Sequence, residues 1–145
     1  MRAARGYLPA VSQKNMEVAR RTLESFNSGG VEAALPFFDP EVEWIAPPEW
    51  LERHVYEGHA GIREIASAWS QNFDAYRLEA QEYIEAGDDV VVLIYQRGRI
   101  KGSSDPIEQP IGYVWSVRDG KTVRVRVHFS WEEALRDAGI EDARD

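Results

Sequence analysis

Three polar side chains at strand-like positions are the first candidates for chemistry. His128 is the one acid–base side chain of its segment that ordinarily titrates near neutral pH. Tyr113 places a phenolic hydroxyl on the same strand face as apolar residues, and Gln96 interrupts an alternating apolar pattern. Since a buried amide needs partners, we predict that Gln96 orients a ligand. His128 and Tyr113 are our candidate catalytic residues.

The role of His128 depends on the face of the strand that it occupies. If Val127 and Phe129 face the helices, His128 points to the outer face with Arg124 and Arg126. If a β-bulge shifts the end of the strand, His128 faces the interior. The sequence leaves both arrangements open.

Metal and cofactor chemistry is not indicated. The chain has no cysteine, which excludes disulfides and thiolate ligands. His54 and His59 are separated by five positions in a segment rich in Pro and Gly, whereas a metal pair on a helix is often at i and i+4. No glycine-rich phosphate loop or serine nucleophile elbow is present. We predict no metal ion and no cofactor.

Aromatic residues are abundant and recur at inward-compatible positions of separate segments. The chain has five Trp, six Tyr and five Phe. Large rings form either ordinary core or the wall of a ligand pocket, and composition alone does not decide between them. On the pocket interpretation, the ligand-binding residues are Trp44, Trp50, Tyr56, Trp69, Phe73, Gln96 and Trp115.

The apolar spacing predicts helices first and strands afterwards. A helix begins at Ser12 and ends near Asn27, before Ser28–Gly30, and a shorter helical segment follows over 31–38, distorted by Pro36. The other expected elements are a strand around Val42–Trp44, a helix over Ile62–Phe73, strands over Tyr76–Ala86, Val90–Lys101, Ile107–Arg118 and Lys121–Phe129, and a short helix after Ser130. This order indicates an α+β domain with helices on one side of a sheet.

The long connection over 46–61 is the predicted lid of the pocket. It contains Trp50 and Tyr56, which would be costly to leave in water. We expect its Pro47–Tyr56 part to fold over something apolar. At 145 residues the chain is one domain, which we assign to 12–140, with a flexible tail at 1–11 and another at 141–145.

Several segments resemble the SnoaL-like branch of the nuclear-transport-factor-like superfamily. The resemblance lies in Phe37–Trp44, Tyr56–Ile62, Asp119–Lys121 and Ser130–Gly139. It implies a strongly curved antiparallel or mixed sheet wrapped around amino-terminal helices, cone-shaped with a central pocket. Polyketide cyclases, ketosteroid isomerases, dehydratases, epoxide hydrolases and non-catalytic modules all belong to this superfamily, so the resemblance implies a fold and leaves the chemistry open.

The chain departs from two mechanisms of these relatives. Ketosteroid isomerases that it resembles carry a carboxylate base just before a proline after the first strand, and the counterpart here is Ala46. Some cyclases place an acid on a late strand, and none stands between Asp119 and Glu132. Neither mechanism can be carried over, which leaves it open whether the protein is an enzyme.

Charge and hydropathy limit the partners. The net charge of −8 disfavours nucleic acid, and no apolar run reaches the ~20 residues of a membrane helix. The start of the chain lacks the apolar stretch of a secretory signal, so we expect a cytoplasmic protein. Related folds commonly pair through the outer sheet face, so we expect a homodimer on the side of Arg97, Arg99, Arg124 and Arg126.

The leading functional hypothesis is a pocket protein that binds a small hydrophobic organic molecule, with isomerase, cyclase or hydrolase activity left open. One alternative is a binding module without turnover. Another is a dimerisation or assembly module whose pocket is a filled core. The aromatic connection from Pro47 to Tyr56 favours either pocket hypothesis over the assembly module.

Overall fold

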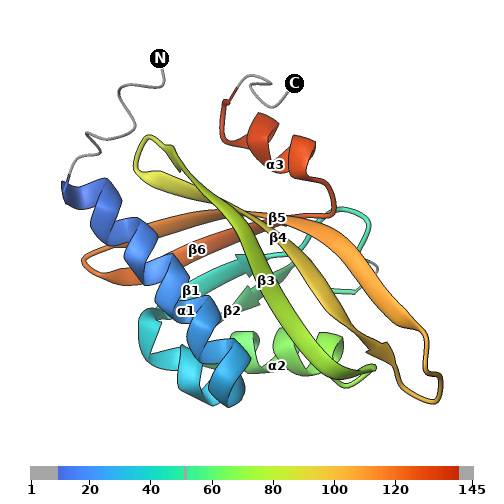
Figure 1. Ribbon diagram of the computed structural model, residues 1–145. Helices are drawn as coiled ribbons and strands as arrows, with labels where there is room; N and C mark the ends of the chain where they lie inside the picture. The colour runs from blue at the N-terminus through green and yellow to red at the C-terminus, as the bar shows by residue number, and fades with distance from the viewer. Residues whose placement is uncertain (1–9, 51, 141–145) are drawn as a thin grey trace.

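The computed structural model describes residues 10–50 and 52–140 (Figure 1). The helices are α1 (Ala10–Ala34), the short 3₁₀ helix η2 (Leu35–Phe37), α2 (Gly58–Ser70) and α3 (Trp131–Asp137). The strands are β1 (Phe38–Ile45), β2 (Val55–Glu57), β3 (Phe73–Ala86), β4 (Asp89–Ile100), β5 (Pro106–Arg118) and β6 (Lys121–His128). The amino-terminal tail was predicted over 1–11, of which residues 1–9 lie outside the described residues and the last two belong to α1. The tail predicted at 141–145 also lies outside the described residues.

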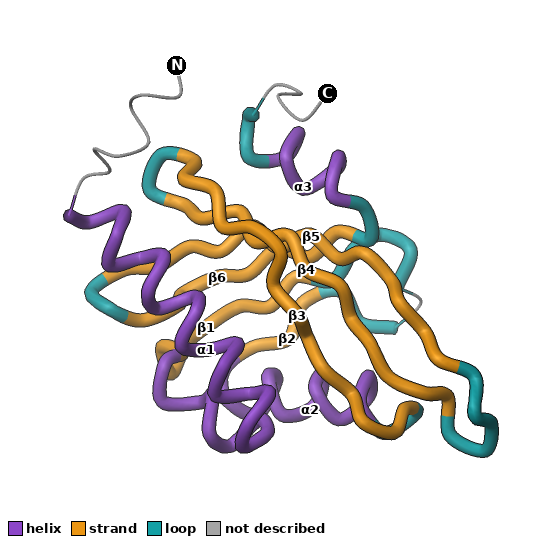
Figure 2. The backbone as a smooth tube through the Cα atoms, in the orientation of Figure 1, coloured by secondary structure: helices purple, strands orange, loops and turns teal. Residues whose placement is uncertain are grey.

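The six strands form one curved, open sheet in the order β2-β1-β6-β5-β4-β3. β1 runs parallel to β6, and all other neighbours are antiparallel. Helices α1 and α2 lie against one side of the sheet, while α3 lies on the other (Figures 1 and 2). This arrangement confirms the predicted fold class, an α+β domain with a strongly curved mixed sheet around amino-terminal helices.

Alternation along the strands gives the sheet two apolar faces. Val90, Val92 and Ile94 of β4 belong to the main core under α1 and α2. The intervening Val91 and Leu93 pack on the outer side against α3. Two buried faces explain why β4 reads as a nearly continuous apolar run instead of alternating with polar residues.

The close contact of α3 with the sheet depends on a glycine. A Cβ atom on Gly112 of β5 would lie 2.4 Å from the Cβ of Ala134, so a side chain there would push the helix away. The indole of Trp131 donates a hydrogen bond to the carbonyl of Ile94 (3.0 Å), which ties the start of α3 to β4. α3 is therefore an integral outer layer of the fold.

Local features of the sequence set several ends of elements. Gly30 breaks the helical backbone of α1 with φ 80°, and Pro36 lies in η2. The tight turn between β5 and β6 has positive φ at Asp119 (54°) and Gly120 (78°), as a type I′ turn requires. The Ser130 hydroxyl accepts a hydrogen bond from the backbone N–H of Glu133, which begins α3.

The expectation of an unbroken connection over 46–61 is wrong. Strand β2 lies within it and pairs with β1, so that Tyr56 stands opposite Trp44. Helix α2 begins at Gly58, four residues before the predicted start at Ile62, and it ends at Ser70. Phe73, the predicted end of this helix, is instead the first residue of β3. α1 likewise begins at Ala10, so Ser12 lies inside the helix. No helix in the described ranges is long and apolar enough to cross a membrane.

A candidate small-molecule pocket

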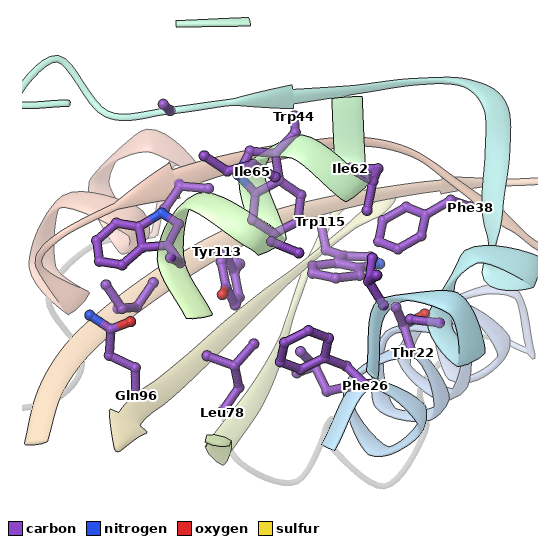
Figure 3. A pocket seen from close by; sticks show the side chains of 18 of the residues that line it. Thr22, Phe26, Phe38, Trp44, Ile62, Ile65, Leu78, Gln96, Tyr113 and Trp115 are labelled. Carbon is purple, nitrogen blue, oxygen red and sulfur yellow. The ribbon is translucent and has the colours of Figure 1, made fainter. Parts of the chain in front are cut away.

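A cavity lies between the concave face of the sheet and the helices α1 and α2 (Figure 3). Its empty volume is about 770 Å³, which includes a part that is open to solvent. Its aromatic lining consists of Phe26, Phe38, Trp44, Trp50, Trp69, Tyr76, Tyr113 and Trp115. None of the described residues that line it is an Asp, Glu, His, Lys or Arg.

The central wall of the cavity is built by β1 and β5. Trp44 of β1 meets Tyr113 and Trp115 of β5 edge to face, with ring centroids 5.5 and 6.3 Å apart. Tyr113 and Trp115 are two positions apart on one strand, so both point to the same side. The edge-to-face contacts hold the rings in fixed orientations against the empty volume.

Two of the lining indoles are anchored by hydrogen bonds. Trp115 donates to the hydroxyl of Thr122 on β6 (2.6 Å), and both residues are fully buried. Trp50 stacks on Trp69 of α2 (4.9 Å between centroids) and donates to the hydroxyl of Tyr56 (2.8 Å). Tyr56 is itself buried beneath this pair, so it supports the lining without belonging to it.

Gln96 is part of a buried polar chain at the cavity. The hydroxyl of Tyr76 donates to Gln96 Oε1 (2.6 Å), and Gln96 Nε2 donates to Gln109 Oε1 (2.7 Å). Gln96 is 1% exposed, so these bonds remove the cost of burying its amide. These two hydrogen bonds fix the amide of Gln96 on the cavity wall, with Tyr76 beside it.

Tyr113 differs from the other polar groups of the wall. Its hydroxyl makes no hydrogen bond to a described residue, although the side chain is only 4% exposed. Burial raises the pKa of Tyr113 far above its usual value, and the nearby Tyr76 raises this pKa further. Burial also raises the pKa of Tyr76. Both phenols are therefore neutral at physiological pH and can donate a hydrogen bond.

Six of the nine predicted site residues line this cavity: Trp44, Trp50, Trp69, Gln96, Tyr113 and Trp115. Three do not. Tyr56 is buried and accepts the hydrogen bond of the Trp50 indole, and Phe73 stacks on Tyr76 with ring centroids 5.6 Å apart. The third, His128, lies on the other face of the sheet.

The placement of His128 decides between the two arrangements that the sequence left open. Its Nε2 lies 2.8 Å from Asp137 Oδ2 of α3, and Arg126 Nε lies at the same distance from that oxygen. The pairing of Gly112 with His128 and Tyr113 with Val127 is regular, and the one shift between β5 and β6 lies at their other end, next to Ser116. Without a bulge near it, His128 stays on the outer face, and a catalytic role in the cavity is not supported.

The outer-face arginines are also engaged within the chain. Arg97 pairs with Glu79 and Glu108, and Arg124 pairs with Glu43. Arg126 pairs with Asp137, as described above. These contacts neutralise most of the basic surface on which the sequence placed a subunit contact.

Other wall residues were missed, namely Thr22 and Phe26 of α1 and Tyr76 of β3. Phe26 belongs to the apolar stripe of α1, so the helical spacing already pointed to it, whereas the polar Thr22 does not belong to that stripe. The sequence placed Tyr76 at the start of a strand, and we assigned its hydroxyl no hydrogen-bond partner. The need of Gln96 for a hydrogen-bond partner was the signal that could have found it.

A curved sheet and two helices enclose an uncharged cavity with an aromatic lining, and this architecture is α+β. The family model of the SnoaL-like domain matches residues 19–125, most of the chain. This protein therefore belongs to the SnoaL-like domain family, and the resemblance seen in the sequence is confirmed.

Solved structures share the fold. An NTF2-like protein of unknown function from Burkholderia pseudomallei is 24% identical, with a TM-score of 0.70 over 85% of this chain and 95% of its own. TerC, co-crystallised with polyporic acid, is 26% identical (TM-score 0.69, 86% and 97% covered). A protein from a Jannaschia species, provisionally assigned as a SnoaL-like polyketide cyclase, is 16% identical (TM-score 0.73, 88% and 93% covered). A search of curated proteins found no match.

Proposed function

We propose that this protein binds a small, neutral and largely apolar organic molecule in the cavity between the sheet, α1 and α2. The observation that carries this proposal is the lining: aromatic and aliphatic side chains with a few neutral polar groups and no charged residue. A charged ligand would lose its hydration there without gaining a counter-ion. A neutral aromatic or alicyclic molecule would instead exchange water for ring contacts.

The relatives support binding of a small molecule without identifying it. TerC was co-crystallised with polyporic acid, and the Jannaschia protein is provisionally assigned to polyketide cyclases.

Binding without turnover is favoured over acid–base catalysis. Ala46, the counterpart of the ketosteroid-isomerase base, lines the cavity and offers no carboxylate. The only titratable groups of the described lining are Tyr76 and Tyr113, whose raised pKa values keep them protonated, so neither supplies a phenolate base. The remaining catalytic route is a neutral tyrosine acting as a general acid, which makes Tyr113 the candidate if turnover is found.

Saturable binding that depends on the cavity is the test. A library of neutral aromatic compounds is screened by thermal shift, and hits are measured by calorimetry. Ala66 of α2 lines the cavity, so Ala66→Trp should fill it and abolish binding; Ser67→Trp places the same side chain on the exposed face of that helix and should not. No saturable hit, or equal loss in both variants, would contradict the proposal and favour an assembly module.

We further propose that the protein forms a homodimer and is cytoplasmic, and both parts of this proposal come from the sequence. The outer face of the sheet is partly covered by α3, and Arg97, Arg124 and Arg126 are paired within the chain. A contact between subunits would use the part of the outer sheet face that α3 leaves uncovered. Sedimentation of the full chain as a monomer at micromolar concentration would rule the dimer out.

A further inference from the structure

We propose that the ligand carries a hydrogen-bond acceptor of the carbonyl type, as in an aryl ketone, and that the hydroxyl of Tyr113 donates to it. This inference rests on the proposed function, because it names the class of molecule that the same cavity takes. It follows from which polar atoms of the wall are already paired and which are not.

Most donors of the wall are engaged. The hydroxyl of Tyr76 donates to Gln96 Oε1, and the hydroxyl of Thr22 donates to the backbone carbonyl of Val18 (2.7 Å). Trp50, Trp115 and Gln96 donate to Tyr56, Thr122 and Gln109 respectively. The acceptor sites that remain on these side chains are lone pairs of hydroxyl and amide oxygens that already take part in a hydrogen bond.

Three donors have no acceptor in the described part of the chain: the hydroxyl of Tyr113 and the indole N–H groups of Trp44 and Trp69. Within those same ranges, Arg97 Nε is the one fully enclosed side-chain nitrogen or oxygen without a partner. The oxygen of Tyr113 must therefore border open space. Figure 3 shows it on the cavity wall, on the side of Gln96 and Leu78.

This imbalance selects for ligand chemistry. An indole N–H only donates, and a neutral phenol donates well, so the free groups favour a ligand oxygen that accepts. An amine or ammonium would bring further donors and would leave the indole N–H groups of Trp44 and Trp69 without an acceptor. The rings of Trp44 and Trp115 lie 5.5 and 5.6 Å from that of Tyr113, so an aromatic body attached to the acceptor would contact them.

A matched pair of probes tests the inference: acetylnaphthalene, an aryl ketone, and isopropenylnaphthalene, in which a CH₂ group replaces the oxygen. Calorimetry on the full chain measures both. After the affinity of each probe is corrected for its partition into octanol, we expect the ketone to bind about tenfold more tightly than the hydrocarbon, as one buried hydrogen bond allows. Tyr113→Phe should remove this preference and leave the affinity of the hydrocarbon unchanged. Tyr95→Phe is the matched control, because Tyr95 packs on Trp131 at the outer face.

The outcomes separate the inference from the function that it rests on. If both probes bind equally well to the unchanged protein, the acceptor hypothesis is overturned while the binding function stands. If the preference survives in Tyr113→Phe, the assignment to Tyr113 is overturned. If neither probe nor any other neutral aromatic compound binds, the proposed function itself fails. A melting temperature of Tyr113→Phe close to that of the unchanged protein shows that its fold is intact.

Discussion

The hydroxyl of Tyr113 borders the cavity and has no partner among the described residues, and this has a consequence for stability in the absence of ligand. Removing an unpaired hydroxyl leaves no donor or acceptor stranded, so Tyr113→Phe should cost no stability. We expect an unchanged free energy of unfolding or a gain of up to about 1 kcal/mol. Urea denaturation followed by tryptophan fluorescence measures it.

Thr122→Val provides the contrast within the same core. Thr122 accepts the hydrogen bond of the Trp115 indole, and valine keeps its shape while removing that acceptor. The stranded N–H should cost about 1–3 kcal/mol. A loss of the same size in Tyr113→Phe would mean that the hydroxyl has a partner in the folded protein, which would remove the basis of the ligand assignment.

At the scale of elements, one side chain ties α1 to the edge of the sheet. Asn27 donates from Nδ2 to the carbonyl of Leu78 (2.7 Å) and accepts the backbone N–H of Leu78 at Oδ1 (2.9 Å). It thereby pairs with the edge strand β3 as a neighbouring strand would, and blocks that stretch for another chain. Leu78 lines the cavity, so the same contact positions part of its wall.

Asn27→Ala should therefore destabilise the protein by about 1–3 kcal/mol, because two backbone groups lose their partner at once. Asn72→Ala serves as the control, since Asn72 makes one exposed bond to the carbonyl of Ala68. Unfolding in urea is the measurement. Equal effects of the two substitutions would show that the bond to β3 adds nothing to the fold.

Helix α3 is held to the sheet by a pair of contacts that depend on pH. Burial alone would raise the pKa of Asp137, but the hydrogen bonds and charges of Arg126 and His128 outweigh it and lower this pKa. A lowered carboxyl pKa contributes stability above the unfolded pKa near ~4, and that contribution is lost as the pH falls through the folded pKa.

Asp137→Asn should consequently destabilise the protein at neutral pH, by about 0.5–1 kcal/mol given solvent screening of this partly exposed group. The difference between variant and unchanged protein should shrink as the pH falls from about 6 towards about 3. Urea titrations across this range measure it. A difference that stays constant would assign the effect to packing of α3 instead of to the carboxylate.

The elements that the sequence predicted well are those whose ends are set by neighbours in the chain. Gly30, the Asp119–Gly120 turn and the Ser130 cap act over a few residues, so local reasoning finds them. β2 was missed because three residues form a strand only by pairing with β1. The start of β3 was missed because Ala75 adopts positive φ (56°) at an irregular pairing, which breaks the alternation that marks a strand.

The candidate site was predictable where the alternation of side chains along a regular strand is enough to tell which residues face the cavity. Trp44, Tyr113 and Trp115 follow from the alternation of regular strands, and the cavity includes all three. Tyr56 and Phe73 depend on the pairing of β2 and on the irregular start of β3, so their side chains could not be placed from spacing. The orientation of His128 depends on whether a β-bulge lies next to it, and only the register of β5 with β6 shows that none does.

At the scale of the whole molecule, charge and cavity are separated. The chain carries a net charge of −8, yet the described cavity lining holds none of its charged side chains. The ion pairs lie on exposed or outer surfaces, with Arg63–Glu32, Arg124–Glu43 and Arg126–Asp137 as examples. The charged side chains therefore lie away from the cavity, as the proposed binding of a neutral ligand requires.

This separation predicts that the affinity for a neutral ligand is independent of pH. The lining tyrosines have raised pKa values, so no wall group changes charge between about pH 5.5 and about pH 9. We expect the dissociation constant of acetylnaphthalene to change less than about twofold over this range, measured by calorimetry.

Ala46→Asp supplies the control: it places a carboxyl group on the wall where the ketosteroid-isomerase relatives keep their base, and burial should raise its pKa into this range. Affinity should then fall as the pH rises, since the charged form opposes an acceptor ligand. A marked pH dependence in the unchanged protein would instead reveal a titrating group in the site and return the acid–base hypothesis.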